Sequence, residues 1–259
     1  MVSFIASYSV AQIANLSRET IQSLTRADIA ALANTQVAAF TTTGISDFSS
    51  TQLSQLSTKQ VTSLSRAQIA ALAPSQIAFS SAQLLAFSAS QFAALDPEDI
   101  AVLTATQLRG ITAADITALG STQLAVLSAT QMSALAVTQL RGFSPQDMGA
   151  LSTTQLGALT GTQMGALSAS QVRAFSTTQV AALTTTQIAG LPASALGSLT
   201  LPQVQALSAT QIGALSIAQL RGLSGPTIAA FSSAQWEALS SQEIATLQAS
   251  QLRALTTTQ

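Results

Sequence analysis

The chain has 259 residues, a formal charge of −1, no cysteine and no histidine. Charged residues make up 7% of it and hydrophobic residues 47%, which is too apolar for a disordered chain. The lack of cysteine and histidine excludes a disulfide framework, thiolate metal sites and the commonest general base. A charge near zero without a basic patch argues against nucleic-acid binding. We therefore expect no metal, no cofactor and no catalytic residue.

The N-terminal segment, MVSFIASYSVAQIANL, has no basic stretch followed by an apolar one, so it shows no secretory signal. Farther along, Ser, Thr or Gln interrupts every apolar stretch. No run approaches the roughly 18 residues that span a bilayer, so we expect no membrane span. The absence of cysteine fits a protein that is exported by a route without an N-terminal signal.

An aliphatic residue follows most of the glutamines, and these anchor residues recur at every eighth position. The series runs from Ile5 to Ile77, loses one residue between Ile77 and Leu84, and then keeps its step of eight to Leu252. It contains 32 anchors. Such a fixed period predicts a repeat architecture. We therefore expect one continuous solenoid domain over residues 1–259, with a one-residue deletion in the segment 77–84.

The repeating octad reads [Ser/Thr]-x-x-Gln-[Ile/Leu/Val/Met]-x-Ala-[Leu/Phe], and its positions are numbered here from 1 at the Ser or Thr. Ser or Thr followed three residues later by Gln is a capping box, in which each side chain bonds the other residue's backbone N–H. Pro74, Pro97 and Pro145 occupy position 2, the first helical residue, where a missing N–H costs nothing. Each octad is therefore predicted to form one helix of about seven residues.

Other regular structures explain the octad less well. A single continuous helix is excluded because eight residues overshoot two helical turns by roughly 80°, so the apolar face would circle the axis. The apolar spacing of three and then five residues is not the alternation of a strand. A β-solenoid stays open as the alternative, although the prolines and alanines disfavour it. We predict an all-α solenoid of very short helices.

A second period, of sixteen residues, lies over the first. Arginine follows the anchor at Arg109, Arg141, Arg173, Arg221 and Arg253, and all their separations are multiples of sixteen. This pattern predicts coils of two octads, or 16 residues, with two helices in each coil. Helices this short are unstable alone, so each coil is expected to depend on its neighbours for stability.

Two of these arginines precede an aspartate by the same six residues, Arg109 with Asp115 and Arg141 with Asp147. The repeated offset predicts ion pairs between the end of one helix and the start of the next. Exposed pairs of this kind contribute about 0 to 1 kcal/mol. A recognition ladder for a charged ligand is the alternative use of these residues.

The consensus Ser/Thr-x-x-Gln-Ile-x-Ala-Leu resembles long octapeptide tracts in large secreted or surface proteins of proteobacteria. The resemblance extends over the whole chain but rests on a low-complexity motif. It implies an extracellular or cell-surface location and no defined activity, and it assigns a role to no residue.

Neither terminal octad carries the polar cap that keeps repeat arrays soluble. We therefore expect exposed end faces at Val2, Phe4 and Ile5 and at Leu252 and Leu255. The sequence predicts a non-enzymatic structural protein that stacks its coils or ends with copies of itself, as an extracellular filament or surface layer. Two alternatives stay open: a regular Ser/Thr array that binds ice or a surface glycan, and a rigid spacer stalk of a larger surface protein.

Overall fold

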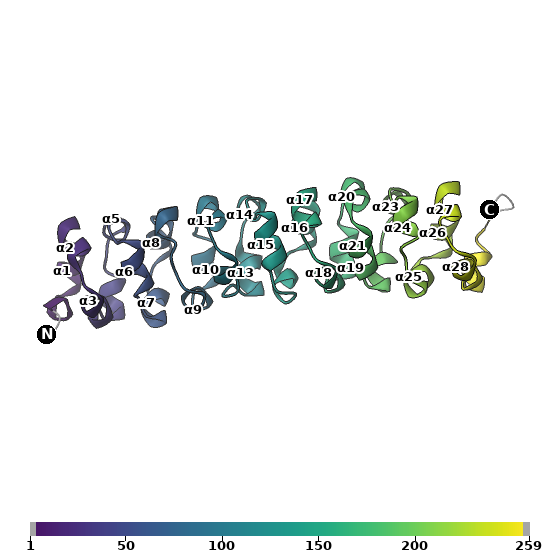
Figure 1. The fold of residues 1–259 in the computed structure, drawn as a ribbon. Coiled ribbons are helices and arrows are strands. Elements are labelled where there is room, and N and C mark those ends of the chain that lie inside the picture. The colour runs from purple at the N-terminus through teal and green to yellow at the C-terminus, as the bar shows by residue number, and fades with distance from the viewer. Residues whose placement is uncertain (1–3, 256–259) are drawn as a thin grey trace. The chain divides into compact units, whose positions relative to one another are not determined.

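The computed structural model describes residues 4–255. The chain divides into two compact units, residues 1–127 and residues 128–259, and each is described by itself. Within each unit, short helices follow one another through tight bends (Figure 1). Residues 4–255 contain no strand. The all-α solenoid of short helices is therefore confirmed, and the β-solenoid is excluded. The single domain over residues 1–259 stays a prediction.

The first unit contains the following helices, where η marks a 3₁₀-helix: η1 (Phe4–Ser7), α1 (Val10–Ala14), α2 (Arg18–Ser23), α3 (Arg26–Ala31), α4 (Asn34–Val37), α5 (Thr42–Ser46), α6 (Ser50–Ser54), α7 (Thr58–Thr62), α8 (Arg66–Ala70), η2 (Pro74–Gln76), α9 (Ser81–Leu85), α10 (Ala89–Phe92), α11 (Pro97–Ala101), α12 (Ala105–Leu108), α13 (Ala113–Ala118) and α14 (Ser121–Ala125).

The second unit contains α15 (Ala129–Ala134), η3 (Gln139–Gly142), α16 (Pro145–Ala150), α17 (Thr153–Gly157), α18 (Gly161–Gly165), α19 (Ala169–Arg173), α20 (Thr177–Ala182), α21 (Thr185–Gly190), α22 (Ala193–Leu196), α23 (Leu201–Gln205), α24 (Ala209–Ile212), α25 (Ile217–Gly222), α26 (Gly225–Ala229), α27 (Ser233–Glu237), α28 (Ser241–Ala245) and α29 (Ala249–Leu252).

The predicted capping box begins most of the helices. At the start of α20, the hydroxyl of Ser176 accepts a hydrogen bond from the N–H of Gln179, and Gln179 Oε1 accepts one from the N–H of Ser176 at 2.6 Å. These reciprocal bonds satisfy backbone donors that a helix start otherwise leaves free. The helices η2, α11 and α16 begin with Pro74, Pro97 and Pro145, as the sequence predicts.

The helices end early because position 8 leaves the helical conformation. The α-helices are four to six residues long, shorter than the predicted seven. Leu183, at position 8 after α20, has an extended backbone with φ −65° and ψ 139°. Its N–H still donates to the carbonyl of Val180 at 3.2 Å, which closes the helix with a 3₁₀-type turn. The extended residue then leads directly into the next cap, Thr184.

Positions 5 and 8 form the apolar core of each unit. The anchors Leu53, Met164 and Val180 are fully buried, at 0% exposure. The residues at position 8 are nearly as buried, and the rings of Phe40 and Phe48 meet edge to face at 4.9 Å. Burying two such side chains contributes about 3 to 6 kcal/mol per octad. The core therefore provides the main stabilisation of helices that are too short to stand alone.

The predicted coil of 16 residues is wrong. Helices in close contact lie three octads apart, as in α10 with α13 in the first unit and α18 with α21 in the second. Side-chain hydrogen bonds from position 4 reach carbonyls 28 and 31 residues earlier. One turn therefore holds between three and four octads. Two octads would leave each anchor with a single facing helix, whereas three to four enclose the apolar side chains completely.

Position 7 is small because it rests on the backbone of a helix three octads earlier. A Cβ on Gly190 would lie 2.4 Å from the carbonyl oxygen of Gly161. In the first unit, a Cβ on Gly110 would lie 2.1 Å from the carbonyl oxygen of Ser81. Neither glycine has a positive φ. Glycine is needed at these sites because two backbones approach closely, not because the glycine adopts a special backbone conformation.

The one-residue deletion is absorbed in a single tight turn after η2. The anchor Ile77 has φ −75° and ψ 63°, and the N–H of Ala78 donates to the carbonyl of Gln76 at 2.7 Å. This geometry is an inverse γ-turn. It brings Phe79 into the core two residues after the anchor instead of three, with 1% exposure. The regular pattern resumes at Ser80, so the deletion leaves the core continuous.

Candidate functional site

The glutamines at position 4 connect one coil with the next. Gln187 Oε1 accepts a hydrogen bond from the N–H of its cap, Thr184, at 2.9 Å. Its Nε2 donates to the carbonyls of Leu156 and Leu159 at 2.9 and 2.8 Å, four octads earlier. The side chain is buried, so both halves of the amide are used where water is excluded.

We call the position-4 glutamines with this pair of roles the glutamine ladder. Its described members are Gln36, Gln52, Gln60, Gln68, Gln76, Gln83, Gln91, Gln107, Gln123, Gln163, Gln171, Gln179, Gln187, Gln203, Gln211, Gln219, Gln235 and Gln251.

The ladder requires an amide because one side chain has to accept at the cap and donate to another coil. An ionised carboxylate accepts only. A satisfied hydrogen bond contributes about 0.5 to 1.5 kcal/mol net, and a buried group left without its partner costs about 1 to 3 kcal/mol. Sequence reasoning found the capping half of this role and missed the donating half. The signal was present, since a capping box accepts Glu as well as Gln, yet Gln dominates position 4.

Aspartate at position 4 keeps the cap and lacks the donor. Asp115 accepts hydrogen bonds from the N–H and the hydroxyl of Thr112, at 2.8 and 2.7 Å. Asp147 accepts one from the N–H of Ser144 at 2.8 Å. In the described part of the chain, neither carboxylate forms the predicted ion pair, with Arg109 and Arg141 respectively. The capping bonds orient each carboxylate toward the start of its own helix.

Asp99 is the most deeply buried of the position-4 aspartates described in the first unit. Its side chain is fully buried, with Oδ2 accepting from the N–H of Asp96 at 3.0 Å and Oδ1 without any partner. Gln91, one octad earlier, donates to the carbonyls of Val61 and Leu64, so the repeat places Asp99 over the next pair of carbonyls. Burial raises the pKa of Asp99 to about 6, and the negative charges of Asp96 and Glu98 contribute in the same direction.

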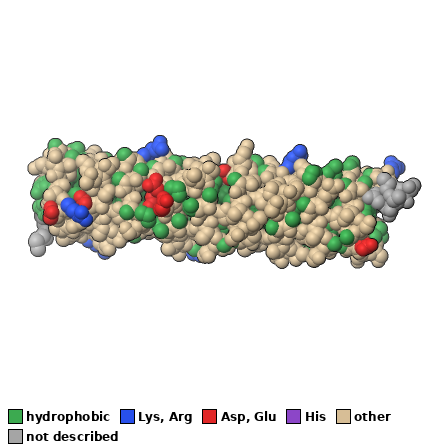
Figure 2. All heavy atoms as spheres, turned by 90° about the horizontal axis from the view of Figure 1, so that it is seen from above, with side chains coloured by type: hydrophobic (Ala, Val, Ile, Leu, Met, Phe, Trp, Pro, Cys, Tyr) green, Lys and Arg blue, Asp and Glu red, His purple; other side chains and the backbone are tan. Residues whose placement is uncertain are grey.

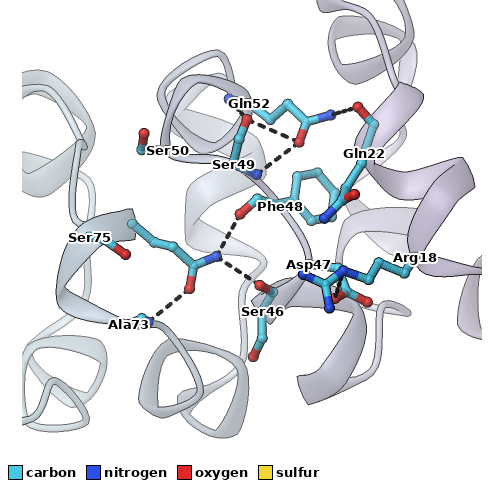
Figure 3. A pocket seen from close by; sticks show the side chains of 11 residues that line it. Arg18, Gln22, Ser46, Asp47, Phe48, Ser49, Ser50, Gln52, Ala73 and Ser75 are labelled. Carbon is cyan, nitrogen blue, oxygen red and sulfur yellow. Dashed lines mark hydrogen bonds and ion pairs between the residues drawn. The ribbon is translucent and has the colours of Figure 1, made fainter.

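An open surface pocket of roughly 530 Å³ lies in the first unit beside an ion pair (Figure 3). Arg18 Nε lies 3.5 Å from Asp47 Oδ1, and the arginine is largely exposed. Several serines line the pocket, but Ser46 Oγ already donates to the carbonyl of Ala71 at 2.7 Å, and Ser49 caps α6. The pocket is open to solvent. Its residues do not include a nucleophile activated by a neighbouring base.

Metal ligands and membrane-spanning helices were also sought in the described residues. Between residues 4 and 255, no group of three or more Asp and Glu lies close enough together to hold a metal ion. Over the same residues, no helix combines the length and the apolar character that crossing a bilayer requires.

The predicted end-face residues differ in accessibility. Phe4 is 49% exposed and Leu252 48%, whereas Ile5 is fully buried and Leu255 is half-buried. Val2 lies outside the described residues. Ile5 therefore belongs to the core of the first coil and not to an accessible face.

The last three anchors form an open face that sequence reasoning recognised only in part. Ile244 is 41% exposed, as Leu252 is at 48%, and Trp236 is half-buried. By contrast, every anchor from Ile5 to Ile228 is buried. The Nε1 atom of Trp236 is buried without a hydrogen-bond partner. The sequence shows which residues are anchors but not which anchors lack a covering coil. That depends on the number of octads in a coil, which only the tertiary structure shows.

One family model matches the chain, in two segments. Residues 92–129 and 161–193 match the ALTTAQ repeat. The chain is similar to that repeat in these two segments, which supports a repeat tract. Its six letters correspond here to Ala182–Gln187, ALTTTQ: the small position 7, the core position 8, the cap with the two residues after it, and the ladder glutamine. The curated proteins searched include no match to the chain.

Proposed function

We propose that this chain is a non-catalytic structural protein that assembles end to end with copies of itself, outside the cell, as a filament or surface layer. The observation that carries the proposal is the exposure of Ile244 and Leu252 at the end of a series whose earlier anchors are buried. An apolar anchor in this architecture is covered by another coil. A further coil is therefore the natural cover for this face.

The surface chemistry supports close association of copies. Charged residues make up 7% of the chain, and few charged side chains appear on the face shown in Figure 2. With a net charge of −1, copies repel one another only weakly, and low net charge promotes association. Burial of the open face would add about 25 cal/mol per Å² of apolar surface.

Two further observations support the non-catalytic and extracellular parts of the proposal. Hydroxyls at position 1 are occupied by helix capping, as Ser176 illustrates, and the sequence contains no histidine to activate another. The location rests on the resemblance of the octad to tracts in secreted and surface proteins. Labelling of intact source cells with an antibody tests it, and label found only after permeabilisation would refute an extracellular role.

Sedimentation velocity and electron microscopy of the purified chain over a range of concentrations test the assembly. We expect particles that lengthen as the concentration rises. The double variant Ile244→Asp, Leu252→Asp should remain monomeric because a charge replaces each exposed anchor. Leu85→Asp is the matched control, since Leu85 is 61% exposed and follows the anchor Leu84 of the first unit; it should assemble like the unmodified chain. A monomeric unmodified chain at millimolar concentration would refute the proposal.

A further inference from the structure

We propose that copies join head to tail, with Gln12 of one copy donating to carbonyls of the last octads of another, and that this joint is weaker than a contact between coils of one chain. The inference rests on the proposed self-assembly and adds to it the direction of the joint, its donor and its strength.

The glutamine ladder gives every coil a direction. In both units its amides donate from a later octad to positions 5 and 8 of an earlier one, as Gln60 does to Ile29 and Leu32 and Gln219 to Ile188 and Leu191. Each coil therefore has a donor side, which faces the preceding coil, and an acceptor side, which faces the following one.

The first octads present an unused donor. Gln12 Oε1 accepts from the N–H of Ser9 at 2.8 Å, which is the usual capping role. Its side chain is exposed, and within residues 4–255 its Nε2 donates to no acceptor. Gln36 occupies the same position of a later octad, where it is buried and donates to the carbonyls of Ile5 and Tyr8. Gln12 thus has the capping role of a ladder glutamine, but among the described residues its amide N–H groups have no carbonyl to donate to.

The last octads present unused acceptors. The carbonyls of Leu239 and Leu247, at position 8, accept no side-chain amide from residues 4–255, whereas that of Leu223 accepts from Gln251 at 2.8 Å. They flank the exposed anchors Ile244 and Leu252. Two such faces brought together would set acceptor against acceptor, which is unfavourable. A donor side meeting an acceptor side repeats the contact found within the chain. Such a heterologous joint leaves one free face at each end and can propagate.

The donor side of the first coil has fewer side-chain amides at position 4 than the donor side of later coils. The next two residues at position 4 are Thr20 and Asp28, and neither side chain carries an amide. Position 7, usually Ala, is Asn15 and Ser23, whose side chains donate to the carbonyls of Ala11 and Thr20, both at 2.8 Å. One ladder amide is therefore available where several act between inner coils. The joint should form reversibly while each chain stays folded.

A gain of function tests the strength of the joint. Thr20→Gln supplies a second amide on the donor side, and we expect the dissociation constant of the joint to fall about fivefold or more, the effect of one additional hydrogen bond. Thr227→Gln is the matched control. Like Thr20, Thr227 is at position 4 behind a serine cap without a capping box, but its octad lies within the second unit. It should raise the unfolding temperature and leave the joint unchanged.

A loss of function tests the donor. Gln12→Glu keeps the cap and removes the amide, so the dissociation constant should rise about fivefold to tenfold. Gln22→Glu introduces the same charge at an exposed site beside an anchor and should have little effect. An unchanged joint in Gln12→Glu, with the circular dichroism of the unmodified chain, would show that Gln12 is not the donor.

Mixing two blocked chains tests the direction. Phe4→Asp, Gln12→Glu blocks the donor side, and Ile244→Asp, Leu252→Asp blocks the acceptor side. We expect each to be monomeric alone and an equimolar mixture to form heterodimers and nothing longer. If the donor-blocked chain still forms dimers by itself, the joint is between like faces; the inference is then overturned while self-assembly stands. If the unmodified chain never associates, the proposed function itself fails.

Discussion

At the residue scale, one change of functional group decides whether the side chain at position 4 donates hydrogen bonds to another coil. Gln91 and Asp99 occupy the same position in consecutive octads, and both accept a hydrogen bond at the cap. Gln91 also donates to two carbonyls, which an ionised Asp99 has no hydrogen to do. The buried carboxylate instead keeps one oxygen without a partner. The preference for glutamine is therefore a requirement for a donor as much as for a cap.

The raised pKa of Asp99 predicts a pH-dependent stability. In the unfolded chain this carboxyl ionises near its ordinary pKa of 3.8, and in the folded chain it keeps its proton up to about 6. Its contribution to the free energy of unfolding is therefore fully present below about pH 4, falls between about pH 4 and 6, and is lost above that. The loss is on the order of 2 to 3 kcal/mol.

Asp99→Asn removes this titration. We expect the variant to be more stable than the unmodified chain at neutral pH and to approach it below about pH 4. Urea unfolding at both pH values measures the difference, and the exposed Glu98→Gln serves as the control for removing a nearby charge. Parallel pH profiles of the unmodified chain and Asp99→Asn would contradict the assignment.

At the scale of the helix, capping hydrogen bonds compensate for the small number of hydrogen bonds within such a short helix. A helix of four to six residues contains too few internal hydrogen bonds to offset the cost of starting it. The capping box at each start supplies two bonds to backbone groups that are otherwise free, and the extended residue at position 8 ends the helix before the next cap. The octad is therefore a complete helix only when its cap, its anchor and a neighbouring coil are all present.

Removing one cap measures this contribution. In Ser152→Ala, the hydroxyl that accepts from the N–H of Gln155 at 3.1 Å is lost at the start of α17. We expect the free energy of unfolding to fall by about 1 kcal/mol. Thr153→Ala, at the exposed next residue, is the control and should change it by less than about 0.5 kcal/mol. Equal effects of the two variants would show that the cap is not the stabilising feature.

At the scale of the whole molecule, stability comes from apolar burial and amide hydrogen bonds and hardly from charge. Within residues 4–255 the ion pair is Arg18 with Asp47, at an exposed arginine. Exposed pairs contribute little. Between Ile21 and Phe231, in contrast, the core residues at positions 5 and 8 are all buried.

This distribution predicts a stability that depends little on sodium chloride. Between low salt and about 0.5 M, where the interactions of exposed charges are largely screened, the unfolding temperature should change by no more than about 2 °C, because one exposed pair contributes at most about 1 kcal/mol. Sulfate should raise it, since this ion strengthens apolar burial. Differential scanning calorimetry in both salts measures the two effects. A marked loss of stability in sodium chloride would mean that charges hold the coils together.

The helical octad could be predicted from the amino-acid sequence, because its causes are local. Capping and the backbone limits of proline act within a few residues, so positions 1 to 4 and Pro74, Pro97 and Pro145 predicted where helices begin. The identity of the core followed equally well, since positions 5 and 8 are the regular apolar ones. The place of the deletion was also visible as a break in the series of anchors.

The number of octads in a turn, and the groups that meet across it, could not be predicted from the sequence because both depend on how the short helices pack. The arginine spacing, in multiples of sixteen residues, describes only which octads contain arginine. The size of the coil depends instead on how many short helices enclose a shared core. That size sets the distance of 28 and 31 residues over which Gln187 finds its carbonyls. It also explains why Ile5 is buried and why Ile244 is not.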